Sequence, residues 1–185
     1  MEAQQLNLWA VATGRLLDAA AFEERWIAGG QLAGVEHDVY YEPSSGRWFK
    51  ANVLSMHANY LEFFQRLELH NALFPEAPVT LEGFLQRGGI LQPLISQPDV
   101  AAVRGARPDE VAVRMALMGF EPLNETDYYN RDLGVRVEDL HDENALITPS
   151  GLLAFIDPIP LLEPADKLRR LSALSARPRR PRPAK

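Results

Sequence analysis

The amino-acid sequence predicts an α+β fold, for three reasons. Segments with the apolar spacing of amphipathic helices occur in the first thirty residues, at 58–74 and at 107–119. Short segments rich in aromatic and β-branched residues, bounded by turns, predict strands between and after these helices. The two kinds of segment do not alternate as strand–helix–strand units, so a parallel α/β sheet is not expected.

Composition indicates one soluble globular domain. The chain has 185 residues, of which 46% are hydrophobic and 24% are charged, which suits one hydrophobic core and is too little for two ordinary domains. It contains no cysteine, so disulfide bonds and thiolate metal sites are excluded, as is common in a reducing compartment. Residues 1–6 are polar, and no apolar run reaches the roughly 20 residues that span a bilayer. We therefore expect a cytoplasmic protein with no membrane partner.

Charge is distributed unevenly along the chain. The formal net charge is −6, yet the segment from Lys167 onward has several basic residues and no acid. The acidic body argues against a nucleic-acid surface on the fold itself. Residues 175–185 alternate arginine with proline and lack an apolar anchor, so we expect a disordered basic tail there. Weak binding of this tail to nucleic acid stays open.

The N-terminal half is expected to place a β-hairpin between two helical regions. Apolar residues at helical spacing predict helix over residues 1–28, before a pair of glycines. Two segments rich in aromatic residues, 36–41 and 47–53, flank a Pro-Ser-Ser-Gly turn and predict the hairpin. Residues 58–74 predict an amphipathic helix that ends at a Phe-Pro pair.

The C-terminal half is expected to contain shorter elements. A short helix is predicted at 81–86, followed by a buried strand at 89–96 in which Pro93 indicates an edge position. Residues 107–119 open with Pro-Asp-Glu and end at glycine, which is typical of a helix with its start and stop. Short strands joined by turns are predicted at 127–130, 134–137, 145–148 and 152–156.

The polar residues with a chemical pattern lie in the last third of the chain. Asp139 and Asn144 are separated by four residues, and Asp157 ends the apolar strand that follows. Phosphoryl transfer needs a carboxylate beside the attacking hydroxyl and oxygen ligands for the metal that neutralises the phosphates. A loop that carries the first two residues and a hairpin that returns Asp157 would supply both. Taken singly, each of these residues is more often a loop cap or a strand end.

This segment resembles the protein-kinase-like superfamily in its pattern of Asp-Leu-His, Asn and Ile-Asp-Pro. More narrowly, the chain resembles the kinase domain found in polyvalent proteins of phages and mobile elements. The shared features are the Glu-His-x-Val-Tyr hairpin at 36–40, the Leu-x-Leu-His-Asn-x-Leu-Phe helix end at 67–74 and the Asp-Leu-His-x-Glu-Asn loop at 139–144. The resemblance covers the chain from Gly29 to Pro160.

The resemblance implies a minimal protein-kinase-like fold of two lobes. Its C-terminal lobe would be truncated, because only residues 158–185 follow Asp157. Two positions depart from the kinase pattern: Val137 stands where a histidine is usual, and Asp157-Pro158-Ile159 replaces Asp-Phe-Gly. The domain organisation implied is an N-terminal helical extension at 1–28, a kinase-like domain at 29–174 and the basic tail at 175–185.

The resemblance also assigns roles within the loop and hairpin. In an ATP- and Mg²⁺-dependent phosphotransferase, Asp139 would orient the acceptor, and Asn144 and Asp157 would bind Mg²⁺ through oxygen atoms. His141 is expected to be a hydrogen-bonding residue of the loop and no metal ligand.

Further roles fall on the first half of the chain. Lys50, on the second strand of the hairpin, would reach the α and β phosphates of ATP. Glu62, on the helix that follows, would pair with this lysine, and we favour it over Glu68 because it lies nearer the helix start and the apolar face. The other residues expected to contact the nucleotide are Gly30, Gly34 and Gln97.

The residues leave three functions open. The first is a kinase that uses ATP and Mg²⁺ on an unknown small-molecule or protein acceptor. The second is a pseudokinase, or a module that binds a nucleotide or protein without turnover, which the short C-terminal lobe favours. The third is a non-enzymatic α+β domain in which the motif arose by chance.

Overall fold

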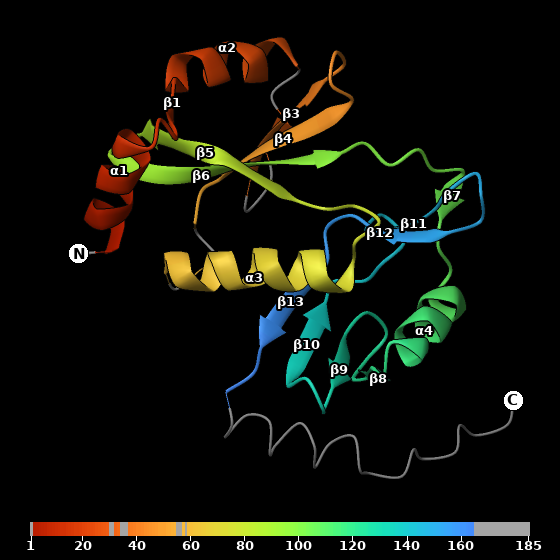
Figure 1. The fold of residues 1–185 in the computed structure, drawn as a ribbon. Helices are drawn as coiled ribbons and strands as arrows, with labels where there is room; N and C mark the ends of the chain where they lie inside the picture. The colour runs from red at the N-terminus through yellow and green to blue at the C-terminus, as the bar shows by residue number, and fades with distance from the viewer. Residues whose placement is uncertain (1, 30–31, 34–36, 55–56, 58, 165–185) are drawn as a thin grey trace, which may run out of the picture. The chain divides into compact units, whose positions relative to one another are not determined.

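The computed structural model describes residues 2–29, 32–33, 37–54, 57 and 59–164. In this part of the chain there are four α-helices and three β-sheets, which confirms the predicted α+β class (Figure 1). The chain divides into two compact units, Met1–Val100 and Ala101–Lys185. The arrangement of two kinase lobes stays a prediction. Gly30, Gly34 and the predicted basic tail lie outside the described residues.

The first unit is built on a six-stranded sheet in the order β1–β5–β6–β4–β3–β2. β1 runs parallel to β5, and the other neighbours are antiparallel. The predicted hairpin is confirmed as β3 and β4, whose turn contains Gly46 at a φ of +62°. The strands are β1 (Leu16–Leu17), β2 (Leu32–Ala33), β3 (His37–Glu42), β4 (Arg47–Asn52), β5 (Thr80–Arg87) and β6 (Ile90–Pro98).

Three helices pack on this sheet, namely α1 (Glu2–Ala12), α2 (Ala19–Ala28) and α3 (Tyr60–Leu73). The prediction of helix in residues 1–28 is confirmed, with a break in which β1 forms. Asp18 starts α2 because its carboxylate accepts a hydrogen bond from the backbone N–H of Ala20 at 2.9 Å. The helix predicted at 58–74 is confirmed as α3, which ends at Phe74.

The core of the first unit lies on both faces of the sheet. Phe84 and Leu85 are consecutive residues of β5, so their side chains project to opposite faces, and both are fully buried. Leu85 packs in a cluster with Phe22 of α2, whereas Phe84 packs with Ala10 of α1 and Tyr60 of α3. Helix α2 therefore covers one face, and α1 and α3 cover the other (Figure 1).

The helix predicted at 81–86 is wrong, because these residues form most of β5. Leu81, Phe84 and Leu85 have helical spacing, yet a strand buried on both faces also carries adjacent apolar residues. Pairing with β1 on one side and β6 on the other makes this segment a strand, and Gly83 leaves room for the first of these partners. A Cβ atom there would lie 2.4 Å from the carbonyl oxygen of Arg15, so the backbone before β1 approaches β5 closely only at a glycine.

The edge position predicted for the strand at 89–96 is also wrong. This strand is β6, which lies inside the sheet between β5 and β4. Pro93 is tolerated there because the pairing of β4 with β6 runs from Arg47–Pro98 to Ala51–Leu94 and ends just before it. Pro93, which has no backbone N–H group, thus lies just beyond the last residue pair of the β4–β6 ladder.

The second unit contains α4 and two small sheets. Helix α4 (Pro108–Leu117) confirms the helix predicted at 107–119. The sheets have the strand orders β13–β10–β9–β8 and β12–β11–β7. Their bounds are β7 (Arg104–Gly105), β8 (Glu121–Pro122), β9 (Tyr128–Asn130), β10 (Val135–Glu138), β11 (Ala145–Ile147), β12 (Leu153–Phe155) and β13 (Ile159–Leu162). The four short strands predicted in the last third are β9, β10, β11 and β12.

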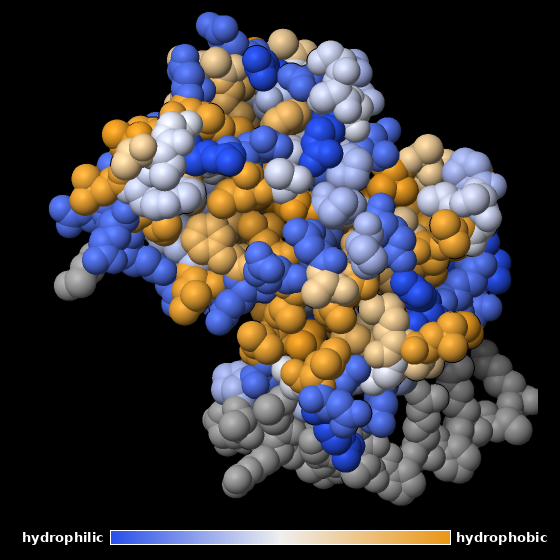
Figure 2. Space-filling view, in the orientation of Figure 1, coloured by the Kyte–Doolittle hydropathy of each residue, from blue (hydrophilic) through white to orange (hydrophobic). Residues whose placement is uncertain are grey.

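The surface mixes hydrophobic and hydrophilic side chains, as the face in Figure 2 shows. Large hydrophobic side chains that are exposed include Leu8 and Val11 of α1 and Val113 and Leu117 of α4. None of the helices in the described ranges is long and apolar enough to cross a membrane.

Candidate functional site

Asp139 begins the loop after β10 in an unusual backbone conformation. Its φ is +67°, in the left-handed region that residues with a Cβ atom seldom adopt. Such a conformation costs about 1 kcal/mol or more and persists where surrounding contacts hold it. Two consecutive backbone N–H groups supply such contacts. Asp139 donates to Oδ1 of Asp127 at 3.3 Å, and Leu140 donates to the carbonyl oxygen of Thr126 at 3.0 Å.

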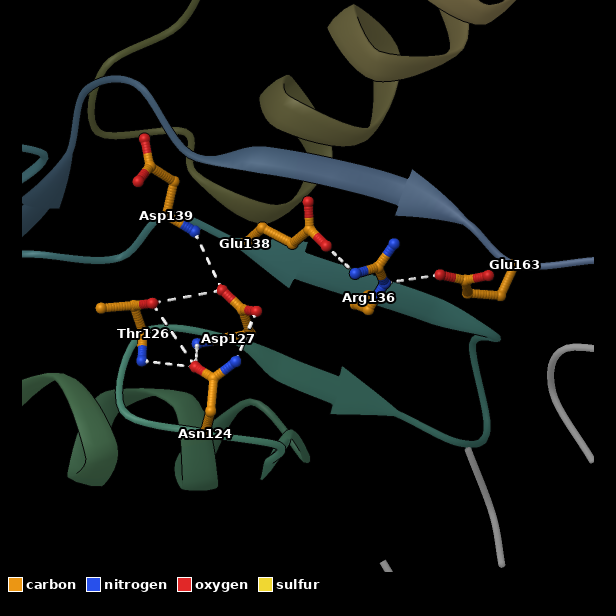
Figure 3. A network of polar contacts seen from close by, with 7 residues as sticks. All are labelled: Asn124, Thr126, Asp127, Arg136, Glu138, Asp139 and Glu163. Carbon is orange, nitrogen blue, oxygen red and sulfur yellow. Dashed lines mark hydrogen bonds and ion pairs between the residues drawn. The ribbon is translucent and has the colours of Figure 1, made fainter. Parts of the chain in front are cut away.

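Asp127 is itself held by the turn that precedes β9 (Figure 3). Nδ2 of Asn124 donates to Oδ2 of Asp127 at 2.7 Å, and Oδ1 of Asn124 accepts from the backbone N–H groups of Thr126 and Asp127 at 2.9 and 2.8 Å. The Thr126 hydroxyl lies 3.3 Å from Oδ1 of Asp127. The hydrogen bonds within this turn therefore fix the Asp127 carboxylate in the position where it accepts from the Asp139 loop.

Asn144 is joined directly to Asp139. Its Nδ2 donates to the backbone carbonyl of Asp139 at 3.0 Å and to the carboxylate Oδ2 at 2.9 Å. Both partners can only accept, so the amide nitrogen faces Asp139 and the amide oxygen faces away. Two of the three residues predicted for the catalytic loop and hairpin are thus in contact.

His141 supports the same loop. Its Nδ1 accepts a hydrogen bond from the backbone N–H of Glu143 at 3.2 Å, so a neutral ring carries its proton on Nε2. Nε2 then donates towards Oδ1 of Asp139, 3.4 Å away, whereas its 3.1 Å approach to Nδ2 of Asn144 brings two N–H groups together and is no hydrogen bond. These contacts agree with a hydrogen-bonding role within the loop.

Asp157 returns to this loop through the β11–β12 hairpin. Ala145 pairs with Phe155 in the ladder, and the backbone N–H of Ile156 donates to the carbonyl of Asn144 at 2.9 Å. The turn closes with the Gly151 N–H bonded to Thr148, and Gly151 has the φ of +82° that such a hairpin needs. Asp157, which is exposed, therefore follows directly after the residue that pairs with Asn144.

β7 packs against the outer side of the loop and hairpin. Gly105 pairs with Leu146 of β11, and the N–H of Ala106 donates to the carbonyl of Ala145 at 2.7 Å. A Cβ atom on Gly105 would lie 2.5 Å from the carbonyl oxygen of Asp142. The loop can approach β7 this closely because residue 105 has no side chain.

The oxygen atoms of Asn144 and Asp157 suit a hard divalent cation. In the described part of the chain, the Asn144 side chain donates through Nδ2 to Asp139, and its Oδ1 is the atom that could serve as a metal ligand. No group of three or more His, Cys, Asp or Glu residues able to hold a metal occurs among the described residues. An amide oxygen and one carboxylate fit Mg²⁺, which takes few protein ligands and completes its shell with water and phosphate.

An ion-pair network lies on the strand that leads into this loop (Figure 3). Arg136 of β10 contacts Glu138 on the same strand and the buried carboxylate of Glu163, which follows β13. The backbone N–H of Glu163 also donates to the carbonyl of Gly134 at 3.0 Å. The Glu163 contacts fasten the end of the β10–β13 pair at Val135 and Leu162, and Asp139 comes directly after the other end of β10.

Lys50 belongs to the first unit and is buried in β4, with an exposed fraction of 7%. Nζ donates to Oε1 of Gln97 at 3.0 Å. Gln97 is 3% exposed and lies opposite Trp48 in the ladder between β6 and β4. The structure therefore brings together two of the residues predicted to contact the nucleotide.

Glu62 lies in the first turn of α3 and is half-buried, whereas Glu68 is exposed. Oδ1 of the capping residue Asn59 accepts from the Glu62 backbone N–H at 2.9 Å. The carboxylate of Glu62 pairs with Arg66 one turn later at 2.9 Å. The predicted pairing of Glu62 with Lys50 stays a prediction.

One comparison with known proteins decides the family. The sequence model of a family described as a serine/threonine/tyrosine kinase found in polyvalent proteins matches residues 1–163. The chain belongs to this kinase family. No match was found among curated proteins.

Membership of the polyvalent-protein kinase family confirms the resemblance inferred from the hairpin, the helix end and the Asp139–Asn144 loop. It also indicates a kinase-like function in general terms and argues against a motif that arose by chance. The family model matches from residue 1, so the matched region includes α1 and α2, whereas the resemblance found in the sequence begins only at Gly29.

The sequence analysis missed some residues that support the Asp139 loop. Asp127 and Thr126 hold the Asp139 loop, and Gly105 permits its close packing. The Asn-Glu-Thr-Asp segment at 124–127 does carry a local signal, because Asn and Asp commonly cap turns. Nothing local indicates its contact with Asp139, which depends on the pairing of β9 with β10.

Proposed function

We propose that this protein is an ATP- and Mg²⁺-dependent phosphotransferase. The observation that carries the proposal is the contact of Asn144 with both the carbonyl and the carboxylate of Asp139, beside a hairpin that returns Asp157 to the same loop. This is the set of side chains that phosphoryl transfer requires: one carboxylate for the acceptor and two oxygen donors for a metal.

Each residue then has a defined task. Asp139 accepts a hydrogen bond from the acceptor hydroxyl and orients it for attack on the γ-phosphate. Oδ1 of Asn144 and the carboxylate of Asp157 hold Mg²⁺, which, when bound, neutralises charge on the β and γ phosphates. Lys50 offers its ammonium group to the α and β phosphates.

The acceptor is a hydroxyl-bearing small molecule or protein. The side chain of Asp139 is 48% exposed, so its carboxylate is accessible to such an acceptor. In an acidic chain the nucleotide phosphates need cationic partners, and the proposal assigns this role to Lys50 and Mg²⁺.

The test of the nucleotide site is a thermal-shift titration with ATP, with and without Mg²⁺. A ligand of the native state raises the melting temperature by mass action. We expect a Mg²⁺-dependent rise that is lost in Asp157→Ala and kept in Asp132→Ala, a matched change at an exposed aspartate between β9 and β10. No rise at millimolar ATP in the cooperatively folding protein would contradict the proposal.

Turnover separates the phosphotransferase from a module that only binds nucleotide. Asp139→Asn is expected to abolish ATP hydrolysis or autophosphorylation while the Mg²⁺-dependent thermal shift persists, because Asp139 acts on the acceptor. A native protein that binds Mg·ATP without transferring phosphate to any acceptor tried would favour the pseudokinase instead.

A further inference from the structure

Lys50 and Gln97 project from the same face of the first unit's sheet. In the β4–β6 ladder, Lys50 lies opposite Ile95 and Trp48 lies opposite Gln97, so residues 50 and 97 are diagonal neighbours. Both are buried, and their side chains meet at 3.0 Å between Nζ and Oε1. A buried ammonium group needs hydrogen-bond acceptors, so the contact with Gln97 helps to fix the position of Nζ.

The Gln97 amide has a single orientation in this environment. Nε2 donates to the carbonyl oxygen of Ala77 at 2.9 Å, and that oxygen can only accept. Lys50, at the other end of the amide, can only donate. The two neighbours agree on the same assignment, so a flip of the amide would break both bonds. Gln97 is therefore a fixed acceptor for Lys50.

The carbonyl of Ala77 connects this amide to α3. Nε2 of His70 lies 2.8 Å from the same oxygen, so His70 donates to it and carries a proton on Nε2. His70 is in the last turn of α3, is 5% exposed and packs edge-on against the ring of Phe74. A continuous chain of buried hydrogen bonds thus runs from His70 through Ala77 and Gln97 to Lys50.

We propose that Gln97 is a positioning residue, which sets the location of Lys50 Nζ and ties it to the end of α3 through Ala77 and His70. The proposal rests on the proposed function, in which Lys50 binds phosphate. The Gln97 contact orients the ammonium group without adding a negative charge beside it. A glutamate in the same place would compete with phosphate for Lys50, whereas an amide holds the lysine ready for an anion.

A first test follows Lys50 itself and needs no nucleotide. An amine-reactive ester modifies the neutral amine, so the labelling rate of Lys50, measured by peptide mass spectrometry, reports how strongly its surroundings hold the charged ammonium group and how easily the reagent reaches it. In Gln97→Leu the lysine loses an acceptor, and we expect labelling about tenfold faster. In Gln97→Glu the added carboxylate stabilises the charged ammonium group, and labelling slows. Gln86→Leu, at an exposed position of β5, is the matched control and leaves the rate unchanged.

A second test follows the link to α3. His70→Phe keeps an aromatic ring beside Phe74 and removes the donor to Ala77. We expect His70→Phe to accelerate Lys50 labelling, as Gln97→Leu does, but by a smaller factor. In the double variant the increase in labelling rate should be smaller than the two single effects combined, because both act through the Ala77 carbonyl.

A third test measures Mg·ATP binding by thermal shift. Both Gln97→Leu and Gln97→Glu are expected to weaken binding, although they change labelling in opposite directions. A native protein without any ATP-induced shift would refute the proposed function and leave the labelling result to stand by itself. Labelling of Lys50 at the native rate in Gln97→Leu, or a change of the same sign in both variants at position 97, would overturn the positioning role.

Discussion

The backbone N–H of Asp139 donates to the Asp127 carboxylate at 3.3 Å, across twelve positions of the chain. Asp139 is in the left-handed conformation, and Asp127 is the residue whose side chain meets it there. The carboxylate of Asp127 is in turn fixed by Asn124 at 2.7 Å. The geometry of the Asp139 loop therefore depends on a turn that takes no part in the proposed chemistry.

Replacement of Asp127 by alanine should loosen the Asp139 loop. We expect a loss of about 1–2 kcal/mol in the free energy of unfolding, as for the removal of hydrogen bonds to a charged group. Turnover should fall about tenfold or more while the Mg·ATP-induced thermal shift persists, because Asp127 acts through the position of Asp139. Urea unfolding and ATP hydrolysis measure the two effects. Asp132→Ala serves as control, and an Asp127 variant with native turnover would contradict the role.

A methyl group at position 105 should disturb the same loop from the other side. In Gly105→Ala the new Cβ would lie 2.5 Å from the Asp142 carbonyl, so either β7 or the loop must move. We expect a destabilisation of about 1–3 kcal/mol. Hydrogen exchange of the amides at 139–144 should rise more than that of β9. Equal exchange in the two segments would show that the loop does not bear the strain.

His57 predicts a loss of stability in mildly acidic solution. Burial lowers its pKa from the ordinary 6.5 to about 4, with Arg66 adding to the effect and Glu62 opposing it. The unfolded chain therefore binds this proton at a higher pH than the native protein does. The free energy of unfolding should fall as the pH drops from 6.5 towards 4 and stay constant above that range. Urea titrations across this range should show a smaller decline in His57→Phe, which keeps the ring contact with Phe63.

The environment of Glu110 predicts a second loss of folding stability, at lower pH. Hydrogen bonds from Arg104 and from the backbone N–H of Arg107 lower the Glu110 pKa from 4.5 to about 2. The native state therefore favours the ionised carboxylate. Its contribution is complete above pH 4.5 and is lost as the pH falls towards 2. Glu110→Gln should flatten the stability profile between these values and leave the His57 window unchanged. An identical acid profile in the variant would contradict the assignment.

Much of the candidate site could be predicted from local sequence patterns. The spacing of Asp139 and Asn144, the turn that ends at Gly151 and the strand that ends before Asp157 are all short-range features. The β3–β4 hairpin and helices α3 and α4 were likewise evident from turn residues and apolar periodicity. The prediction that Lys50 lies on a strand succeeded for the same reason.

The errors arose where pairing with distant segments decides the structure. Leu81, Phe84 and Leu85 have the spacing of a helix, but Phe84 and Leu85 are buried on opposite faces of the sheet. Pro93 indicated an edge strand, yet the β4 ladder stops before it and β6 is central. The local sequence cannot contain this information, because it depends on which partner strands arrive on each side.

The sequence by itself determined the α+β class, the order of most elements and the family, since these follow from periodicity, turn residues and a motif confined to a short segment. Only the tertiary structure decided how the functional side chains are held. The contact of Asp127 with Asp139, the space left by Gly105 beside Asp142, and the buried chain from His70 to Lys50 join residues far apart in the sequence. Such contacts form only when sheets and helices pack, because hydrogen bonding and close approach depend on position in space.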